Sequence, residues 1–410
     1  MGKRSWTKRA LGIGVFGLLA ASRGLGADNS VRALHGESTT GLASDITAKY
    51  LAGLIVPAAP VGLEVAGNPW MTHSAELDRA WKHTEQQQLS AIASWAPEFL
   101  GNGYQQNGTM FYMFSGPDFL YAHAFFPNAR TYILCGTEAV GAVPDLSKVP
   151  PEALPVALAN IRKSLESVLS WSFFITKDMK TDLTRAQLSG TLPLLYVFLA
   201  RTGCTIDSVT PVTVDRDGRV SEDDKGEHAQ SGTARVDGGA ARVAGASGGN
   251  ASDQTPGARI VFTSSSGSPQ TLYYFCSDLS DDGIKAKPGF LRFCEEQSQG
   301  VSLLKAASYL MHETGFSRVR EFLLGHSELI LQDDSGIALR FLQGWDIRYC
   351  GQYTGPIEVF KKYWQSDLAD EYARNAPAPL PFGFGYQWQP NRSDLMIVTR
   401  PEDDKVTSDQ

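Results

Sequence analysis

The stretch Thr109 to Glu138, TMFYMFSGPDFLYAHAFFPNARTYILCGTE, decides the fold of this chain. It contains two apolar runs of strand length, Thr109–Phe114 and Thr131–Gly136. Strands without polar alternation are typical of parallel sheets that are buried on both faces. The segment between them, Gly116–Phe126, has the length of a crossover helix. The stretch therefore predicts a strand, a helix and a second strand that is parallel to the first.

The turn Ser115-Gly116-Pro117-Asp118 predicts how this helix begins. Ser115 has the side chain of an N-cap, and Asp118 follows three residues later, as in a capping box. The pattern FSGPD differs from the G-x-S-x-G turn of serine hydrolases, and His123 lies about 12 Å further along the helix. We therefore interpret Ser115 as a cap and His123 as a hydrogen-bonded histidine of the core.

The ends of the two predicted strands indicate where a ligand would bind. In open α/β sheets, ligands bind outside the carboxyl ends of the strands. Here those ends carry Ser115 and Asp118, and then Thr137 and Glu138. Two carboxylates on neighbouring strands suit acid–base catalysis or a bound cation, and two solvated acids beside a cap are the simpler alternative. We predict Asp118 and Glu138 as candidate catalytic residues, and Ser115 and Thr137 as candidate ligand contacts.

The first 27 residues have the features of a secretory signal peptide. Two Lys-Arg pairs within residues 3–9 precede the apolar segment 11–21, which is too short to span a bilayer. Cleavage near Ala27 leaves 32 basic and 44 acidic residues, a net charge of −12. We expect an exported protein, periplasmic or extracellular, with no stable membrane span after cleavage. An uncleaved anchor is the alternative.

The charge and the cysteines of the chain limit its partners. A net negative chain argues against nucleic acid, whose binding depends on cationic contacts to phosphate. Five cysteines are scattered without a C-x-x-C pair, so one or two disulfides and buried free thiols are both compatible with the sequence. The sequence around His73 lacks a zinc motif, and that around Asp215 lacks a calcium loop. We expect neither a bound metal nor a cofactor.

Composition divides the chain into segments that we expect to form one compact domain. The tract 215–257 is rich in Gly, Ala, Ser, Asp and Arg and has few large apolar residues, so we predict a disordered insertion. Strands are predicted directly before it, at Ile206–Val214, and directly after it, at Ala258–Ser264. The segments are a signal peptide (1–27), an N-terminal α/β part (28–214), the insertion (215–257), a C-terminal α/β part (258–400) and an acidic tail (401–410).

The second half of the chain predicts further helices and hairpins. Val301–His312 and Phe316–Gly325 have helical character, and 328–331 with 337–342 are predicted to pair around the turn Asp333–Gly336. The predicted fold is α/β or α+β. It has a mixed sheet that contains the parallel unit at about 109–136 and antiparallel hairpins, with helices covering the sheet.

The segment Pro381–Trp388, PFGFGYQW, is the sharpest local pattern outside the central unit. Its aromatic residues Phe382, Phe384, Tyr386 and Trp388 alternate, so a strand would place all four on one face. The two intervening glycines would allow a ligand or another backbone to approach the other face. Tyr386 and Trp388 are therefore candidate contacts to flat ligand faces such as sugars. A core strand with inward aromatics is the alternative.

Three functions remain open at the level of the sequence. Because the chain shows no coherent catalytic constellation, we favour an exported protein that binds a small molecule or a cell-envelope glycan. The second function is a secreted hydrolase that uses Asp118 and Glu138 as an acid–base pair. The third is a structural or assembly protein of the cell envelope, with residues 221–257 as a contact arm.

Overall fold

The computed structural model describes residues 30–56, 67–171, 173, 188–223, 234–237, 240–243 and 253–401. The predicted signal peptide, residues 224–233, 238–239 and 244–252 of the predicted insertion, and the acidic tail beyond residue 401 lie outside these residues. None of the described helices combines the length and the apolar character that crossing a membrane requires.

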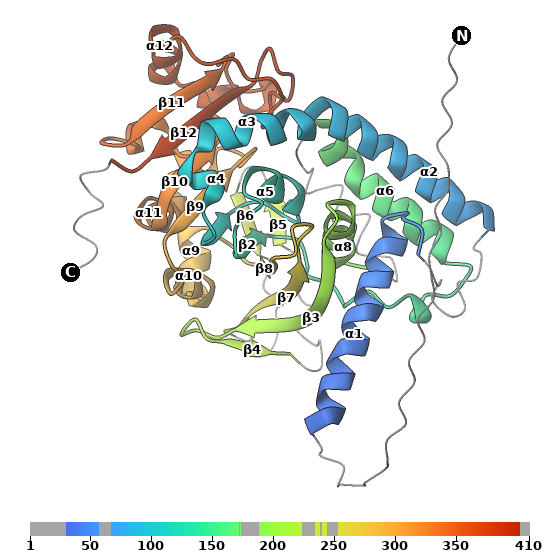
Figure 1. Cartoon of the computed structure of the whole chain (residues 1–410). Coiled ribbons are helices and arrows are strands. Elements are labelled where there is room, and N and C mark those ends of the chain that lie inside the picture. The colour runs from blue at the N-terminus through green and yellow to red at the C-terminus, as the bar shows by residue number, and fades with distance from the viewer. Residues whose placement is uncertain are drawn as a thin grey trace, which may run out of the picture.

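A ten-stranded mixed sheet forms the centre of the described structure (Figure 1), which confirms the predicted α/β or α+β class. Its strands are β1 (Thr109–Tyr112), β2 (Thr131–Gly136), β3 (Thr205–Val214), β4 (Val220–Glu222), β7 (Thr255–Thr263), β8 (Pro269–Cys276), β9 (Gly300–Leu304), β10 (Ser327–Gln332), β11 (Asp346–Gly351) and β12 (Asp394–Thr399), and β5 (Ala234–Asp237) with β6 (Ala240–Val243) forms a separate pair. The order across the large sheet is β11-β12-β10-β9-β1-β2-β8-β7-β3-β4.

Five neighbouring strands of this sheet are parallel, namely β10, β9, β1, β2 and β8. Numbered along the chain, their order across the sheet is 3-2-1-4-5, which is that of a doubly wound α/β sheet. Antiparallel strands extend both sides, with β12 and β11 beyond β10, and β7, β3 and β4 beyond β8. The strand order reverses between β1 and β9, so the crevice of the fold is expected there.

The predicted central unit is present, because β1 and β2 pair in parallel with Thr109 opposite Thr131. The predicted cap of the helix between them is wrong. The helix begins at Phe119, and its N-cap is Asp118, whose carboxylate accepts a hydrogen bond from Tyr121 N at 3.2 Å. Ser115 bridges the two strands instead, since its Oγ accepts a hydrogen bond from Cys135 N at 3.2 Å.

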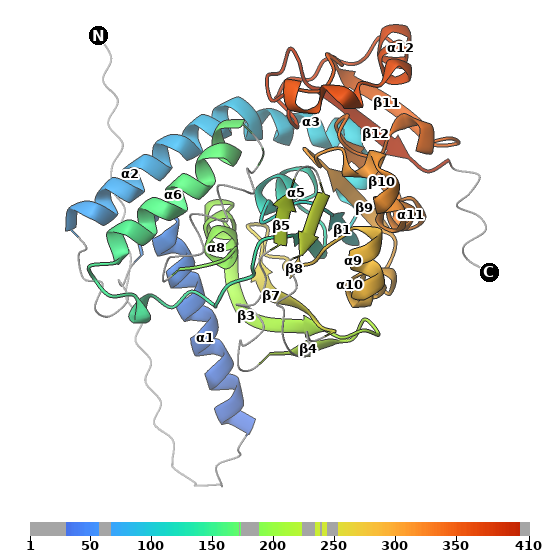
Figure 2. The ribbon, with the colours of Figure 1, turned by 180° about the vertical axis from the view of Figure 1, so that it is seen from behind.

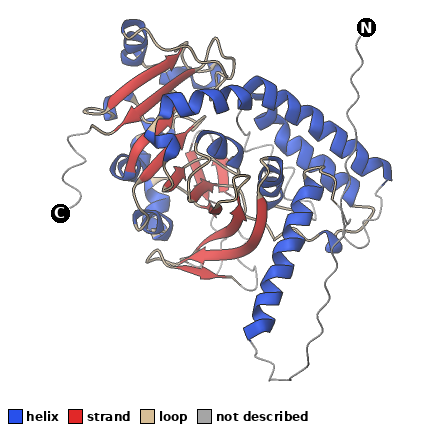
Figure 3. Cartoon of the chain, viewed as in Figure 1, coloured by secondary structure: helices blue, strands red, loops and turns tan. Residues whose placement is uncertain are grey.

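Helices cover both faces of the sheet (Figures 2 and 3). Along β1, Met110 and Tyr112 belong to one hydrophobic cluster, and Phe111 and Met113 belong to the other. The first cluster includes residues of α1, α2, α3, α5, α6 and α8, and the second includes residues of α9 to α12. The helices are α1 (Ser30–Leu51), α2 (Gly67–Thr84), α3 (Ser90–Leu100), α4 (Asn102–Gln105), α5 (Phe119–Phe125), α6 (Leu154–Trp171), α8 (Leu192–Arg201), α9 (Asp281–Ala286), α10 (Gly289–Glu295), α11 (Ser317–His326) and α12 (Ser366–Arg374), and a π-helical turn (Glu85–Leu89) joins α2 to α3.

The predicted helix Val301–His312 is wrong, because Gly300–Leu304 is the central strand β9. All five of its residues are buried between β1 and β10. The short apolar run has no periodicity that separates a buried strand from a buried helix. Gly300 permits the pairing, because a Cβ atom at this position would overlap the carbonyl oxygen of Thr109.

The predicted hairpin at 328–331 and 337–342 is also wrong, although the turn between its two segments forms. Gly336 N donates a hydrogen bond to Asp333 O at 3.1 Å, but Leu339–Phe341 is a short 3-10 helix. β10 pairs with β9 and β12 instead. The side chain of Gln332 takes the place of a partner strand, since it bonds the backbone N–H and C=O groups of Ile337 at 2.8 and 2.9 Å.

The aromatic segment before β12 is a tight turn, so the strand predicted there is wrong. Phe384 and Gln387 form an isolated bridge, and the four aromatic residues do not share one face. Phe382 and Phe384 pack in the core, Tyr386 is partly buried, and Trp388 is 37% exposed. Positive φ at the intervening Gly385 breaks the alternation on which the prediction rested.

Candidate functional site

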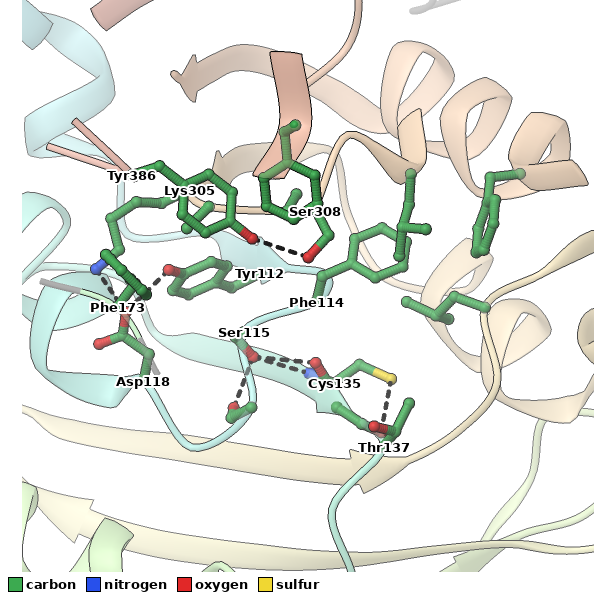
Figure 4. Close-up of a pocket in the computed structure, with 18 of the residues that line it drawn as sticks. Tyr112, Phe114, Ser115, Asp118, Cys135, Thr137, Phe173, Lys305, Ser308 and Tyr386 are labelled. Carbon is green, nitrogen blue, oxygen red and sulfur yellow. Dashed lines mark hydrogen bonds and ion pairs between the residues drawn. The ribbon is translucent and has the colours of Figure 1, made fainter. Parts of the chain in front are cut away.

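A pocket of about 570 Å³ lies at the carboxyl ends of β1, β2 and β9 (Figure 4). We call it the switch-point pocket, because β1 and β9 are the strands between which the order of the sheet reverses. Its volume falls within the range of about 300–1,000 Å³ that is typical of small-molecule sites. The strand ends that line it comprise Tyr112, Phe114–Gly116, Asp118, Cys135–Glu138 and Lys305–Ser308.

The structure brings most of the predicted site residues together here. Ser115, Asp118, Thr137 and Glu138 all line the switch-point pocket, and so does Tyr386 from the turn before β12. Trp388 is not among the residues that line it. The two candidate carboxylates therefore share one pocket, as the strand-end argument required.

Asp118 is held by three donors and forms a buried ion pair. Its Oδ2 lies 2.8 Å from Lys305 Nζ and accepts a hydrogen bond from Tyr112 at 2.9 Å. The side chains of Asp118 and Lys305 are only 2% and 1% exposed, and Lys305 Nζ also lies 3.3 Å from the ring centroid of Tyr121. Burial lowers the pKa of Lys305, and the adjacent Asp118 partly offsets this effect.

Glu138 has a different environment. Its Oε2 accepts a hydrogen bond from Thr137 N at 3.1 Å, and the Tyr274 hydroxyl donates to its backbone carbonyl at 2.9 Å. Burial raises the pKa of Tyr274, and the charge of Glu138 raises it further. Gly136 makes room for this side chain, because a Cβ there would overlap Glu138 Oε2 and lie 2.8 Å from Gly116 Cα.

Strained backbone is concentrated around the pocket. Five non-glycine residues in the described part of the chain have positive φ, and Ala376 is the one that lies elsewhere. Such conformations cost of order 1–3 kcal/mol each and are often found at functional sites. The other four follow β1 and β9. Phe114 (φ 62°), Ala306 (φ 52°) and Ser308 (φ 55°) line the pocket, and Tyr309 (φ 58°) is the next residue along the chain.

The turn Asp333–Gly336 after β10 holds the strained loop in place. Asp333 Oδ2 accepts a hydrogen bond from Ala306 N at 3.0 Å, and Ser335 Oγ accepts one from Ala307 N at 2.7 Å. The Tyr309 hydroxyl donates to Asp334 Oδ2 at 2.8 Å. The aspartate pair predicted as a turn therefore also positions the backbone of the pocket.

Burial raises the pKa values of the aspartates behind this loop. The pKa of Asp334 rises to about 8, because the side chain is buried and because Asp333 lies beside it. Burial also raises the pKa of Asp333, and it raises that of Asp394 well above the ordinary value. At neutral pH this cluster therefore carries less negative charge than three ordinary carboxylates would.

Aromatic rings form another wall of the pocket. The ring centroid of Tyr386 lies 5.0 Å from that of Phe360 and 5.1 Å from that of Phe173. The Tyr386 hydroxyl shares a hydrogen bond of 2.8 Å with Ser308 Oγ, so this wall is joined to the loop after β9 (Figure 4). Tyr363 completes the wall from the 3-10 helix Glu358–Tyr363.

Sequence reasoning missed two parts of the site. Lys305 lay inside a predicted helix, although a lysine that directly follows an apolar run is a signal for the end of a buried strand. Phe173 and Phe360 belong to segments without strand periodicity, so no sequence signal connected them to the pocket. The prediction that His123 is a hydrogen-bonded histidine of the core is wrong, because its buried Nε2 has no hydrogen-bond partner among the described residues.

His73 lies apart from the pocket and uses both ring nitrogens in the fold. Nε2 is 2.7 Å from Leu51 O, and Nδ1 is 3.0 Å from the guanidinium of Arg162. Within the described ranges, no three His, Cys, Asp or Glu side chains are grouped so that they could hold a metal ion.

The fold and the pocket together define a doubly wound α/β protein with a small-molecule-sized crevice at its switch point. Comparison with protein-family models, curated proteins and solved structures finds no match to this chain.

Proposed function

We propose that this protein binds a small organic molecule in the switch-point pocket. The proposal rests on the observation that strained backbone and the crevice of the fold occur at the same place. Three of the five strained non-glycine residues in the described part of the chain line the crevice that the strand order specifies, and a fourth, Tyr309, directly follows one of them. Strain of this kind persists only where the surrounding structure enforces it, and it is often part of a binding or catalytic geometry.

The residues that line the pocket indicate which chemical groups such a ligand would have. Tyr386 and Phe360 offer ring faces against which a flat heterocycle or a sugar ring can stack. The strand ends offer polar groups, among them the side chains of Thr137, Glu138 and Ser277. A ligand with one flat ring and several hydroxyl groups, of the size of a nucleoside or a small glycan, matches both features.

Substitution of Tyr386 tests the proposal. A thermal-shift screen of the purified chain against nucleosides, nucleotides, sugars and cell-wall fragments would identify a ligand, because a concentration of 100 times Kd adds about 2.7 kcal/mol to the stability. We expect Tyr386→Leu to weaken binding of that ligand about tenfold, the loss typical of one aromatic contact. Calorimetric titration measures the change.

Trp388→Leu is the matched control, because Trp388 is partly exposed and does not line the pocket. It should leave the affinity unchanged. Equal losses in the two variants would refute binding in this pocket. Circular dichroism of both variants separates weakened binding from unfolding.

A hydrolase is the second candidate, because Asp118 and Glu138 line the same pocket. The three donors around Asp118 leave Glu138 as the better placed group for proton transfer. Chromogenic esters and glycosides test this function. Turnover that Glu138→Gln abolishes while ligand binding persists would establish hydrolysis, and absence of turnover with every substrate would leave the binding role.

Export is a further part of the proposal, supported by the basic residues at 3–9 and the apolar segment 11–21. Sequencing the N-terminus of the protein from the exported fraction of its host tests it. A first residue near 28 is expected. Full-length chain confined to the cytoplasm would contradict it.

A further inference from the structure

We propose that the ligand of the switch-point pocket carries a positive charge, as an organic ammonium or sulfonium group, and is not a phosphorylated compound. This inference rests on the proposed function and specifies the chemical class of the ligand. Three features of the pocket carry it: a helix N-terminus that is occupied by a carboxylate of the protein itself, a second carboxylate that has no cationic partner among the described residues, and a wall of aromatic rings.

The first feature is the start of α5. In doubly wound proteins the loop after the first strand receives the phosphate groups of a nucleotide, which bind the free N–H groups of the following helix. Here the carboxylate of Asp118 takes that place and accepts the hydrogen bond from Tyr121 N. Pro117 removes a further donor. A phosphate would meet a carboxylate where other proteins of this architecture offer N–H groups.

The second feature is the charge balance of the lining. Asp118 and Lys305 neutralise each other as a buried pair. Lys362 stands at the rim, 71% exposed, with its Nζ 3.6 Å from Glu313. Glu138 has no ion-pair partner among the residues that the structure describes, although its side chain is 5% exposed. The charge that the pocket leaves uncompensated is therefore negative.

The third feature is the position of the aromatic rings. Phe360, Tyr386 and Phe173 face the pocket with neighbouring centroids about 5 Å apart. The face of an aromatic ring is the negative end of its quadrupole, and it attracts cations most strongly where water is excluded. The lining of one pocket therefore combines aromatic rings with the carboxylate of Glu138, and this combination suits a cation.

Pairs of probe molecules that differ by one positive charge test whether the pocket prefers a cationic ligand. Choline and 3,3-dimethylbutan-1-ol have the same shape, and S-adenosylmethionine and S-adenosylhomocysteine share a nucleoside and an amino acid. We expect the cationic member of at least one pair to bind about tenfold more tightly than its neutral counterpart. Adenosine should bind at least as well as ADP. Thermal shift and calorimetric titration of the full chain provide the affinities.

The substitution Glu138→Gln tests whether the carboxylate of Glu138 causes the preference for the cationic probe. The variant should lose most of the discrimination within the pair. Glu98→Gln is the matched control, because it removes the same charge from an exposed position on α3 that does not line the pocket. Its discrimination should equal that of the unmodified chain.

The results of these binding experiments distinguish failure of the cation inference from failure of the proposed function. Tighter binding of ADP than adenosine, or equal binding within both pairs, overturns the cation inference and leaves a small-molecule site in place. Failure of every probe and of the wider ligand screen overturns the proposed function itself, and the cation inference with it.

Discussion

Gly385 lies against the carboxylate of Asp333, and this contact joins the turn before β12 to the turn after β10. Its φ of 66° belongs to the left-handed region that glycine adopts without a steric penalty. A Cβ atom at this position would overlap Asp333 Oδ2. Because Asp333 also accepts the hydrogen bond from Ala306 N, a displaced carboxylate would release the strained loop of the pocket.

We predict that Gly385→Ala destabilises the protein far more than Gly267→Ala. Gly267 also has positive φ, but nothing lies within 4 Å of a Cβ built on it. The backbone penalty of about 1–2 kcal/mol is common to both variants. Gly385→Ala should lose roughly 2 kcal/mol more, the scale of a broken buried network. Urea unfolding measures both, and equal losses would show that the contact with Asp333 contributes nothing.

At the scale of elements, the turn after β10 holds the loop after β9. Asp333, Asp334 and Ser335 each accept a hydrogen bond from the residues that follow Lys305. These hydrogen bonds tie the loop to the turn, so we expect the protonation state of the turn to affect the geometry of the pocket. Gln365 adds a further tie, since its Nε2 donates to Asp334 O at 3.1 Å.

The stability of the protein should fall as the pH rises from 6.5 to 8. The pKa of Asp334 is about 8 in the folded chain and about 3.9 in the unfolded chain. The protonated carboxyl therefore favours folding below pH 4, and this contribution is lost as the pH approaches 8. One such group gives a slope of up to about 1.4 kcal/mol per pH unit.

The buried histidines do not contribute to the change in stability between pH 6.5 and 8. Burial lowers the pKa values of His73, His123 and His312 to about 4. Their titration therefore makes the stability increase with pH between about 4 and 6.5, and it does not change the stability above about pH 6.5. Asp334→Asn should flatten the slope between pH 6.5 and 8 in denaturant unfolding. The exposed Asp346→Asn is the control. An unchanged slope in Asp334→Asn would show that Asp334 is ionised in the folded protein.

At the scale of the whole molecule, the five cysteines contribute as apolar core residues. All five are buried, and none of them forms a disulfide. Burial raises the pKa of Cys350 to about 11, and it raises those of Cys135 and Cys294 well above the ordinary thiol value. The fold therefore does not depend on a disulfide.

We predict that a thiol reagent labels none of the five cysteines in the folded protein and all five after unfolding in denaturant. The physical reasons are exclusion of the reagent from the core and a low fraction of thiolate. Ellman's reagent measures the number of accessible thiols. A reducing agent should leave the unfolding midpoint unchanged, and a lower midpoint would indicate a disulfide in the mature protein.

The β1–α5–β2 unit could be predicted because all its signals are local. Two uncharged runs bound a segment of helical length, and the strand ends place Ser115, Asp118, Thr137 and Glu138 at one edge. The other half of the pocket could not be predicted in this way. β9 is recognisable only through its partners on both sides, and the ion pair of Asp118 with Lys305 joins positions that the sequence does not relate.

The segment Pro381–Trp388 shows how a local pattern can mislead. Alternating aromatics predict a strand only if the backbone stays extended, and positive φ at Gly385 turns the chain between Phe384 and Tyr386. Tyr386 lines the pocket and Trp388 does not, so the two residues provide a test variant and its control. The contact with Asp333 that requires a glycine there comes from a segment about 50 residues away.

The central position of β1 determines the order in which the protein can be assembled. Its first partner, β2, follows it almost at once, but its second partner, β9, is synthesised roughly 190 residues later. Contacts between such distant segments make folding slow. Before β9 joins the sheet, the chain has only one half of the pocket, and Asp118 lacks its ion-pair partner Lys305. We expect the ligand to enter only the finished protein, as the last component to arrive.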